Sequence, residues 1–292
     1  MFRLRHIFTL LLLFMVAQLM GQTPQETTIN ASHRRYVTPT GAYSNRGTTW
    51  ADAKNNIQDA INDLVASHLL PGEVWVKEGT YRPTESTESG GSSLYASFKI
   101  PAGITVRGGF AGNEVTLNDR MVKYIDKDGK TVGTAKIGDT FDKDYTEKRF
   151  LHPTILTGDL SSRQANFTWN DQSHRYATQF YGNAYHVVWF ATNGFDSKGR
   201  ANALQLNDDS WTATLEGMII KRGYAYNSSL EGHPHNAYGG GAYMVKGSMM
   251  RDVWIECCEA SRNGGAIYMD GGGVCDHVFV TTSQAQGIGT SY

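Results

Sequence analysis

Several acidic side chains in this chain are of the type that carries out hydrolytic chemistry. Two carboxyl groups about 5–9.5 Å apart serve as acid and base, or acid and nucleophile, in glycoside hydrolysis. Asp159, Asp208 and Asp209 are the candidates for such a pair, and their separation in space does not follow from the sequence. The segment Asp126–Lys130 begins like a calcium-binding loop, but no closing carboxylate follows at the required distance. Its Asp128-Gly129 dipeptide favours a tight turn instead.

Histidine and cysteine side chains could hold a metal or form disulfides. His233 and His235 lie on one polar segment, but a metal site needs further ligands at a usable spacing, and none is evident. The cysteines Cys257, Cys258 and Cys275 fall at positions that small residues occupy in the repeat described next. This favours buried thiols that act as small hydrophobes. In an exported protein Cys257 could pair with either of the other two, and this alternative stays open. We expect no metal and no cofactor.

An internal repeat indicates the elements that must position these residues. Arg251–Ser261 is echoed 25 residues later by Asp276–Gln286, and Gly239–Met244 is echoed by Asn263–Met269. Such a period is too short for a domain and too long for a hairpin. It is typical of a solenoid, in which each unit buries its apolar face only against its neighbours. Leu215–Gly223 aligns as a third copy when a loop of about ten residues is allowed after it.

The aligned strands predict two inward rows and one outward row, because strand side chains alternate between faces. The inward rows are Met218, Val253 and Val278, and Ile220, Ile255 and Val280. The outward row is Ile219, Trp254 and Phe279. An exposed row of large apolar residues could stack sugar rings, so these three are the candidate ligand-binding residues. Alternatively the loop after Tyr226, or another segment, packs over them, and this is favoured because loops commonly cover such patches.

The N-terminal region predicts export and a covering helix. Residues 1–21 have a basic start, an apolar run of about 14 residues and a small residue before a polar stretch. That run is short for a bilayer span of roughly 20 residues, which favours a cleaved signal peptide over a membrane anchor. Residues 22–34 are predicted to be flexible. A helix over 50–69, capped by Thr48 or Thr49, carries one apolar stripe and would cover the first unit of the repeat.

Strand-like segments recur between this helix and the repeat. They are Arg35–Gly41, Glu73–Lys77, Gly79–Pro83, Ser97–Pro101, Ile104–Phe110, Thr154–Asp159 and His186–Phe190. Polar insertions separate some of them, at 118–150, near 161–182 and near 194–210. We expect the insertions to project outward, because turns of a stacked solenoid face solvent whereas its strands do not.

These segments together resemble a known family. Their sequence is similar to the N-terminal half of secreted right-handed parallel β-helix proteins, which include the pectate-lyase-like superfamily and the repeats of chlamydial polymorphic outer-membrane proteins. The residues that carry the resemblance are Trp50–Ala53, Val74–Val76, Gly79–Tyr81, Ile104–Glu114, Arg120, Thr154–Asp159 and Gly264–Ile267. The resemblance implies an all-β fold over 35–292, a right-handed parallel β-helix with an N-terminal capping helix and long loop insertions. The repeat stops in mid-unit at Tyr292, so we expect a truncated array.

No group of residues in the sequence indicates a catalytic centre, and this determines the functional expectation. The formal net charge is −1, so neither sign of charge dominates and no nucleic-acid partner is expected. The acidic cluster with a nearby basic residue that is typical of the lyases is not found. We therefore predict an exported, extracellular or cell-surface protein, non-catalytic and without a membrane span in its mature form. It would present a lateral face for adhesion or for binding polysaccharides or cell-surface glycans. The alternative is a polysaccharide lyase or glycoside hydrolase that acts on an extracellular polysaccharide.

Overall fold

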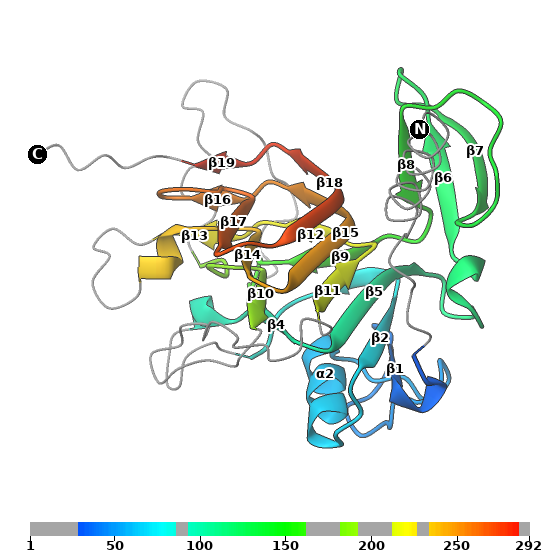
Figure 1. The fold of residues 1–292 in the computed structure, drawn as a ribbon, viewed down its shortest axis with the longest axis horizontal. Coiled ribbons are helices and arrows are strands. Elements are labelled where there is room, and N and C mark those ends of the chain that lie inside the picture. Colours follow the sequence, from blue (N-terminus) through cyan, green and yellow to red (C-terminus); the bar gives the residue numbers. More distant parts are fainter. Residues whose placement is uncertain (1–28, 86–92, 162–181, 192–211, 227–233, 286–292) are drawn as a thin grey trace, which may run out of the picture. The chain divides into compact units, whose positions relative to one another are not determined.

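The computed structural model describes residues 29–85, 93–161, 182–191, 212–226 and 234–285, and Figure 1 shows how its elements are arranged. The chain divides into two units, Met1–Asn30 and Ala31–Tyr292, and every described helix and strand belongs to the second. The predicted signal peptide lies outside the described residues, as do most of the polar insertions near 161–182 and 194–210.

The largest sheet contains nine strands, and all of its pairs are parallel. The strand order is β1-β2-β5-β11-β15-β12-β9-β3, and β18 also pairs with β15. Its strands are β1 Arg34–Val37, β2 Gly72–Lys77, β3 Gly79–Tyr81, β5 Ile104–Phe110, β9 Thr154–Thr157, β11 Ala213–Glu216, β12 Ile219–Lys221, β15 Ser248–Glu256 and β18 Val274–Thr281. The first half of β15 pairs with β11 and its second half with β12. β11 and β12 thus follow one another along one edge of β15, and β18 pairs with its other edge. The sheet as a whole is curled into a half-barrel.

Three smaller sheets accompany the half-barrel in the described residues. A parallel sheet contains β4 Phe98–Pro101, β10 Val188–Ala191, β14 Ala242–Val245 and β17 Ile267–Asp270. A second parallel sheet contains β13 Tyr224–Ala225, β16 Glu259–Ala260 and β19 Gln284–Ala285. The third, which we call the insertion sheet, is antiparallel and contains β6 Met121–Ile125, β7 Thr131–Lys136 and β8 Glu147–Phe150. Short 3-10 helices lie at Ala31–His33, Ser93–Tyr95, Leu117–Asp119 and Pro234–Ala237.

The prediction of a single right-handed parallel β-helix is wrong. The described residues form mostly strands and one α-helix, arranged as a curled parallel half-barrel with several further sheets, one of them antiparallel. The local part of the prediction is confirmed, because Val253 pairs with Val278 at the 25-residue offset. The same offset of 25 residues also pairs β14 with β17 and β16 with β19. The segments between the earlier strands are longer and unequal, so the repeat carries no information on how those strands curl.

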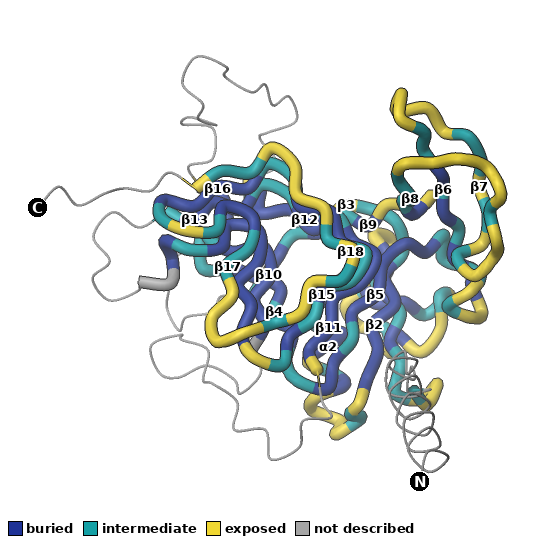
Figure 2. The backbone as a smooth tube through the Cα atoms, turned by 45° about the horizontal axis from the view of Figure 1, so that its top comes forward, coloured by how far each residue is buried: buried dark blue, intermediate teal, exposed yellow. Residues whose placement is uncertain are grey.

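The core lies between the main sheet and the β4-β10-β14-β17 sheet. Met218, Val253, Ile220 and Ile255 from the two predicted inward rows are fully buried. In the last strand, β18, Val278 is partly buried against this core, whereas Val280 is 50% exposed. Figure 2 shows the same gradient, with buried backbone along β2, β5 and β15 and exposed backbone along β18. The residues of each inward row are thus buried at β12 and β15, which a following strand pairs with, and more exposed on β18.

The α-helix α2, Ile57–Ala66, is shorter than the helix predicted over 50–69. Asn56 is its N-cap in place of Thr48 or Thr49, and the Asn56 side chain accepts hydrogen bonds from the backbone N–H groups of Gln58 and Asp59. Residues 48–52 form bends and a turn instead, and the backbone of Lys54 bonds to Tyr36 of β1 and to Thr38, which follows β1. The helix buries Ile57, Ala60, Ile61 and Leu64 and packs against β1, β2 and β4. It therefore covers apolar side chains of the core next to β1, β2 and β4.

Candidate binding site beneath the insertion sheet

The outward row of large apolar residues is present in the structure. Ile219 on β12 pairs with Trp254 on β15, and Trp254 pairs with Phe279 on β18. The Trp254 and Phe279 rings stack with centroids 5.5 Å apart and planes 9° apart. The predicted register of the three candidate residues is therefore confirmed.

The insertion sheet covers most of this row. Val122, Tyr124 and Phe150 of the insertion sheet form one apolar cluster with Trp254, and Ile219 packs against it. Only 3% of Trp254 is exposed, whereas 40% of Phe279 is exposed. The alternative that a segment packs over the row is thus correct, and that segment is the insertion at 118–150. The loop after Tyr226 lies outside the described residues.

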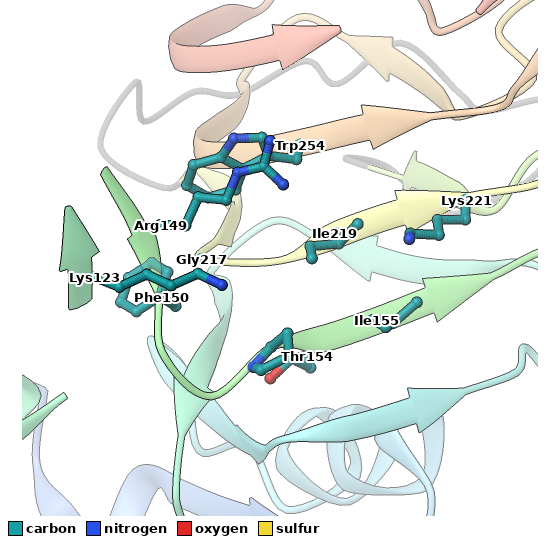
Figure 3. Close-up of a pocket in the computed structure, with 10 residues that line it drawn as sticks. Lys123, Arg149, Phe150, Thr154, Ile155, Gly217, Ile219, Lys221 and Trp254 are labelled. Carbon is teal, nitrogen blue, oxygen red and sulfur yellow. The ribbon is translucent and has the colours of Figure 1, made fainter. Parts of the chain in front are cut away.

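A cavity of about 240 Å³ remains where the insertion sheet meets the main sheet. Ile155, Ile219 and Trp254 provide apolar wall, and Thr154 and Gly217 lie beside them. Lys123 and Arg149 reach the cavity from the insertion sheet, and Lys221 reaches it from β12. In Figure 3 the ammonium ends of Lys123 and Lys221 point into the space from opposite sides. An apolar wall and converging cations therefore share one partly open cavity.

Two carboxylates hold two of these cations. Glu147 accepts a hydrogen bond from Arg149 Nε at 2.5 Å and one from Trp254 Nε1 at 2.9 Å. Glu256 lies 2.9 Å from Lys221 Nζ and 3.8 Å from an outer nitrogen of Arg149. Each of these two carboxylates is thus paired with a cation that lines the cavity.

Trp254 lines the cavity without presenting an open ring face. Phe279 stacks on the ring, and the Arg149 guanidinium carbon lies over it at 5.8 Å from the centroid. A sugar that stacks flat on Trp254 would have to displace one of these neighbours. The ring therefore acts as side wall and as a fixed partner for Arg149 and Glu147, and the accessible aromatic ring of the row is Phe279.

We compared the chain with known proteins. No protein-family model, no curated protein and no solved structure matches the chain. Among the residues that the structure describes, no helix is long and apolar enough to cross a membrane.

Asp159, the candidate hydrolytic residue that the structure describes, does not line this cavity. Asp159 is 3% exposed, lies 3.5 Å from Arg222, and its carboxylate accepts hydrogen bonds from Ser161, so it stabilises a turn. Asp208, Asp209 and His233 lie outside the described residues, as does the side chain of His235. Within the described ranges no group of three or more His, Cys, Asp or Glu side chains could hold a metal ion.

The Asp126–Lys130 segment forms the predicted tight turn. The Asp126 carboxylate accepts hydrogen bonds from the backbone N–H groups of Asp128 and Lys130, both at 2.9 Å. Gly129 adopts a left-handed φ of 78° at its tip. The calcium-like spacing of these aspartates is therefore explained by a turn between β6 and β7 whose carboxylate binds backbone N–H groups.

All three cysteines are free thiols in the structure. Cys258 is buried, and burial raises the pKa of its thiol to about 12, so it behaves as the predicted small hydrophobe. Cys257 Sγ lies 3.4 Å from Thr282 Oγ1, and Cys275 pairs with Met250, both as the 25-residue offset predicts. Cys275 itself is exposed, contrary to the expectation of a buried thiol.

The sequence did not predict that these charged residues line one cavity. Lys123 and Arg149 belong to an insertion that was expected to project outward, and Lys221 lies far from both along the chain. The one sequence signal is alternation in β6 and β8, where charged residues are interleaved with Val122, Tyr124 and Phe150. That pattern predicts a sheet with one apolar face, which must pack on something.

Proposed function

We propose that this chain is an exported, non-catalytic glycan-binding protein whose binding site is the cavity beneath the insertion sheet. The observation that carries the proposal is that the apolar side chains of Ile155, Ile219 and Trp254 line one partly open cavity together with Lys123, Arg149 and Lys221. A pyranose ring has apolar C–H faces and a rim of hydroxyl groups. An apolar wall next to charged hydrogen-bond donors is complementary to such a ring.

The size of the cavity supports a small ligand group. Pockets that enclose drug-sized ligands measure about 300–1,000 Å³, and this cavity measures about 240 Å³. One sugar ring or one terminal unit of a chain suits such a volume. The partly exposed ring of Phe279, next to Trp254 in the same row, is positioned to contact a neighbouring sugar unit.

The ion pairs support binding rather than catalysis. Glu147 and Glu256 are the carboxylates that contact lining side chains, and each is bound to Arg149 or Lys221. A general base must be free to accept a proton from the substrate. A carboxylate that already binds a guanidinium or an ammonium group is not free in this sense. The basic and apolar pattern of residues 1–21 supports export.

Binding of the purified chain to a panel of neutral and acidic polysaccharides tests the proposal. Ile219→Trp fills the cavity with an apolar ring and should abolish binding, because Ile219 lines the space that the sugar would occupy. Val115→Trp is the matched control, since Val115 is 79% exposed and does not line the cavity. Retained binding by I219W, or no binding by the wild-type chain, would contradict the proposal. Release of unsaturated or shortened products would instead establish catalysis.

A further inference from the structure

We infer that the cavity selects a sugar that carries a single negative charge, a uronate carboxylate or a sulfate ester, and that Lys123 is the residue that anchors this charge. The inference rests on the proposed function and names the class of glycan. It is carried by two observations, the placement of like charges across two strands and the balance of charge around the cavity.

Two cations lie directly opposite each other in the insertion sheet. Lys123 on β6 and Arg149 on β8 are register partners in an antiparallel pair, and both line the cavity. Like charges at directly opposite positions destabilise a sheet. Lys221 brings a third positive charge into the same space from the main sheet. An anion bound in the cavity would offset the repulsion between Lys123 and Arg149.

The surrounding carboxylates neutralise two of the three cations. Arg149 is bound by Glu147, and Lys221 is bound by Glu256. Lys123 makes no ion pair or hydrogen bond through its ammonium group with any residue that the structure describes. One positive charge thus remains uncompensated. A ligand group with one negative charge makes the total charge around the cavity zero. A phosphate monoester carries nearly two negative charges at neutral pH, so it would leave an excess of negative charge.

Lys123 lies where the anionic group of a bound sugar would be placed. Lys123 is half-buried, and it is flanked on β6 by Val122 and Tyr124, which are buried in the apolar cluster of the insertion sheet. Its ammonium end points into the cavity toward the side from which Lys221 enters (Figure 3). A sugar ring against Ile155 and Ile219 would then place an anionic substituent near Lys123. Partial enclosure by apolar side chains weakens solvent screening and strengthens this attraction.

Matched pairs of probes separate charge from shape. We would titrate the full chain by calorimetry with an oligoglucuronate and its neutral methyl ester, and with a sulfated dextran oligomer and plain dextran. The charged member of at least one pair should bind at least about tenfold more tightly, the effect of one charge-assisted contact. Lys123→Gln should remove this preference and Lys123→Arg should keep it. Lys130→Gln is the control, because Lys130 is an exposed lysine of the same insertion outside the cavity.

The stability of the free variants gives a second readout. Lys123→Gln removes the repulsion from Arg149 and should raise the melting temperature without ligand, whereas a merely structural lysine would lower it. Equal binding of the charged and neutral members of both pairs, or an unchanged preference in K123Q, would overturn the inference while the proposed function stands. Absence of binding to every glycan defeats the proposed function and this inference together.

Discussion

At the scale of single residues, Trp254 joins the main sheet to the insertion sheet. Its ring lies against Phe279 from β18, and its Nε1 donates a hydrogen bond to Glu147 of β8. It is nearly fully buried, so the ring contributes apolar burial and a hydrogen bond at once. Because it contacts both sheets, Trp254 is a sensitive probe of how firmly they are joined.

Two substitutions at Trp254 separate these contributions. Trp254→Ala should lower the free energy of unfolding by about 3–5 kcal/mol, because it removes a large buried ring. Trp254→Phe keeps an aromatic ring but leaves Glu147 without one donor, and should cost about 1–3 kcal/mol. Urea titration followed by circular dichroism measures both values. A loss below about 1 kcal/mol for W254A would mean that the two sheets are not joined through this ring.

The close approach of the two sheets depends on a glycine. Gly109, at the end of β5, has a φ of 85°, and a Cβ atom there would run into the Phe150 ring of the insertion sheet. Its left-handed backbone would strain most other residues by about 1 kcal/mol, and the clash with a buried ring adds to that strain. Gly129 has a similar φ of 78°, but a Cβ atom at that position would meet no other atom within 4 Å.

The two glycines therefore form a matched pair for a test by thermal unfolding. Gly129→Ala should cost only the backbone strain, about 1 kcal/mol. Gly109→Ala should cost at least about 2 kcal/mol more, because the Phe150 ring must move from its packed position. If the two variants unfold at the same temperature, the insertion sheet does not pack against Gly109 in solution.

At the scale of elements, alternating charges cross the strands of the main sheet. Arg34 on β1 binds Glu73 on β2, Glu73 binds Arg107 on β5, and Arg107 binds Glu216 on β11. Arg120, which leads into β6, closes this series on Glu216 at 2.7 Å. A slip of any strand by one residue would turn its charge to the opposite face, so the series favours a single register. Register would otherwise be specified only by apolar rows.

Glu216 is the residue of this series whose substitution should lower the stability of the fold most. Burial alone would raise the pKa of its carboxyl group, but the guanidinium groups of Arg107 and Arg120 lower it below the ordinary value. Glu216→Gln leaves two buried guanidinium groups undercompensated and should cost about 3–5 kcal/mol in guanidinium chloride unfolding. Asp276→Asn is the control, because its partner Arg251 and the Asp276 carboxylate are 33% and 41% exposed. That variant should lose less than about 1 kcal/mol.

The sequence predicted elements better than their arrangement. The strand at Ile104–Phe110 and the turn at Asp128-Gly129 follow from alternation and turn chemistry, which are local. The helix begins later than predicted, because backbone bonding between Lys54 and β1 is a long-range event that helical spacing does not reveal. The row at Ile219, Trp254 and Phe279 was predicted from the repeat. The cavity was not, because Lys123 and Lys221 meet only through the fold.

At the scale of the whole molecule, acid stability depends on a histidine in the core. His186 is 1% exposed, its ring lies against Trp189 and Tyr243, and its Nδ1 lies 2.9 Å from the Gly239 carbonyl oxygen. Burial lowers the pKa of its imidazole to about 4 from an ordinary value of 6.5. The imidazole is therefore neutral in the folded protein at physiological pH, and Nδ1 donates the hydrogen bond to Gly239.

The sign of the resulting pH dependence is fixed by this depressed pKa. Between pH 6.5 and about 4 the unfolded chain binds a proton at His186 that the folded chain does not. The stability contributed by the neutral imidazole is present above pH 6.5 and is lost as the pH falls toward 4, a loss of about 3 kcal/mol. The folded core must then either admit a charge or open, so we expect acidification to destabilise the protein through His186.

Comparison of the wild-type chain with His186→Asn isolates this effect. The Asn amide can still donate to the Gly239 carbonyl but does not titrate, so H186N should be less stable than wild type at pH 7.5 and lose less on acidification. The difference in unfolding free energy between the two proteins should shrink by about 3 kcal/mol between pH 7.5 and 4. His68→Asn is the control, because His68 is exposed and its variant should follow the wild-type curve. Parallel pH curves for wild type and H186N would mean that the imidazole is solvated, and that the core around Trp189 and Tyr243 is open to water.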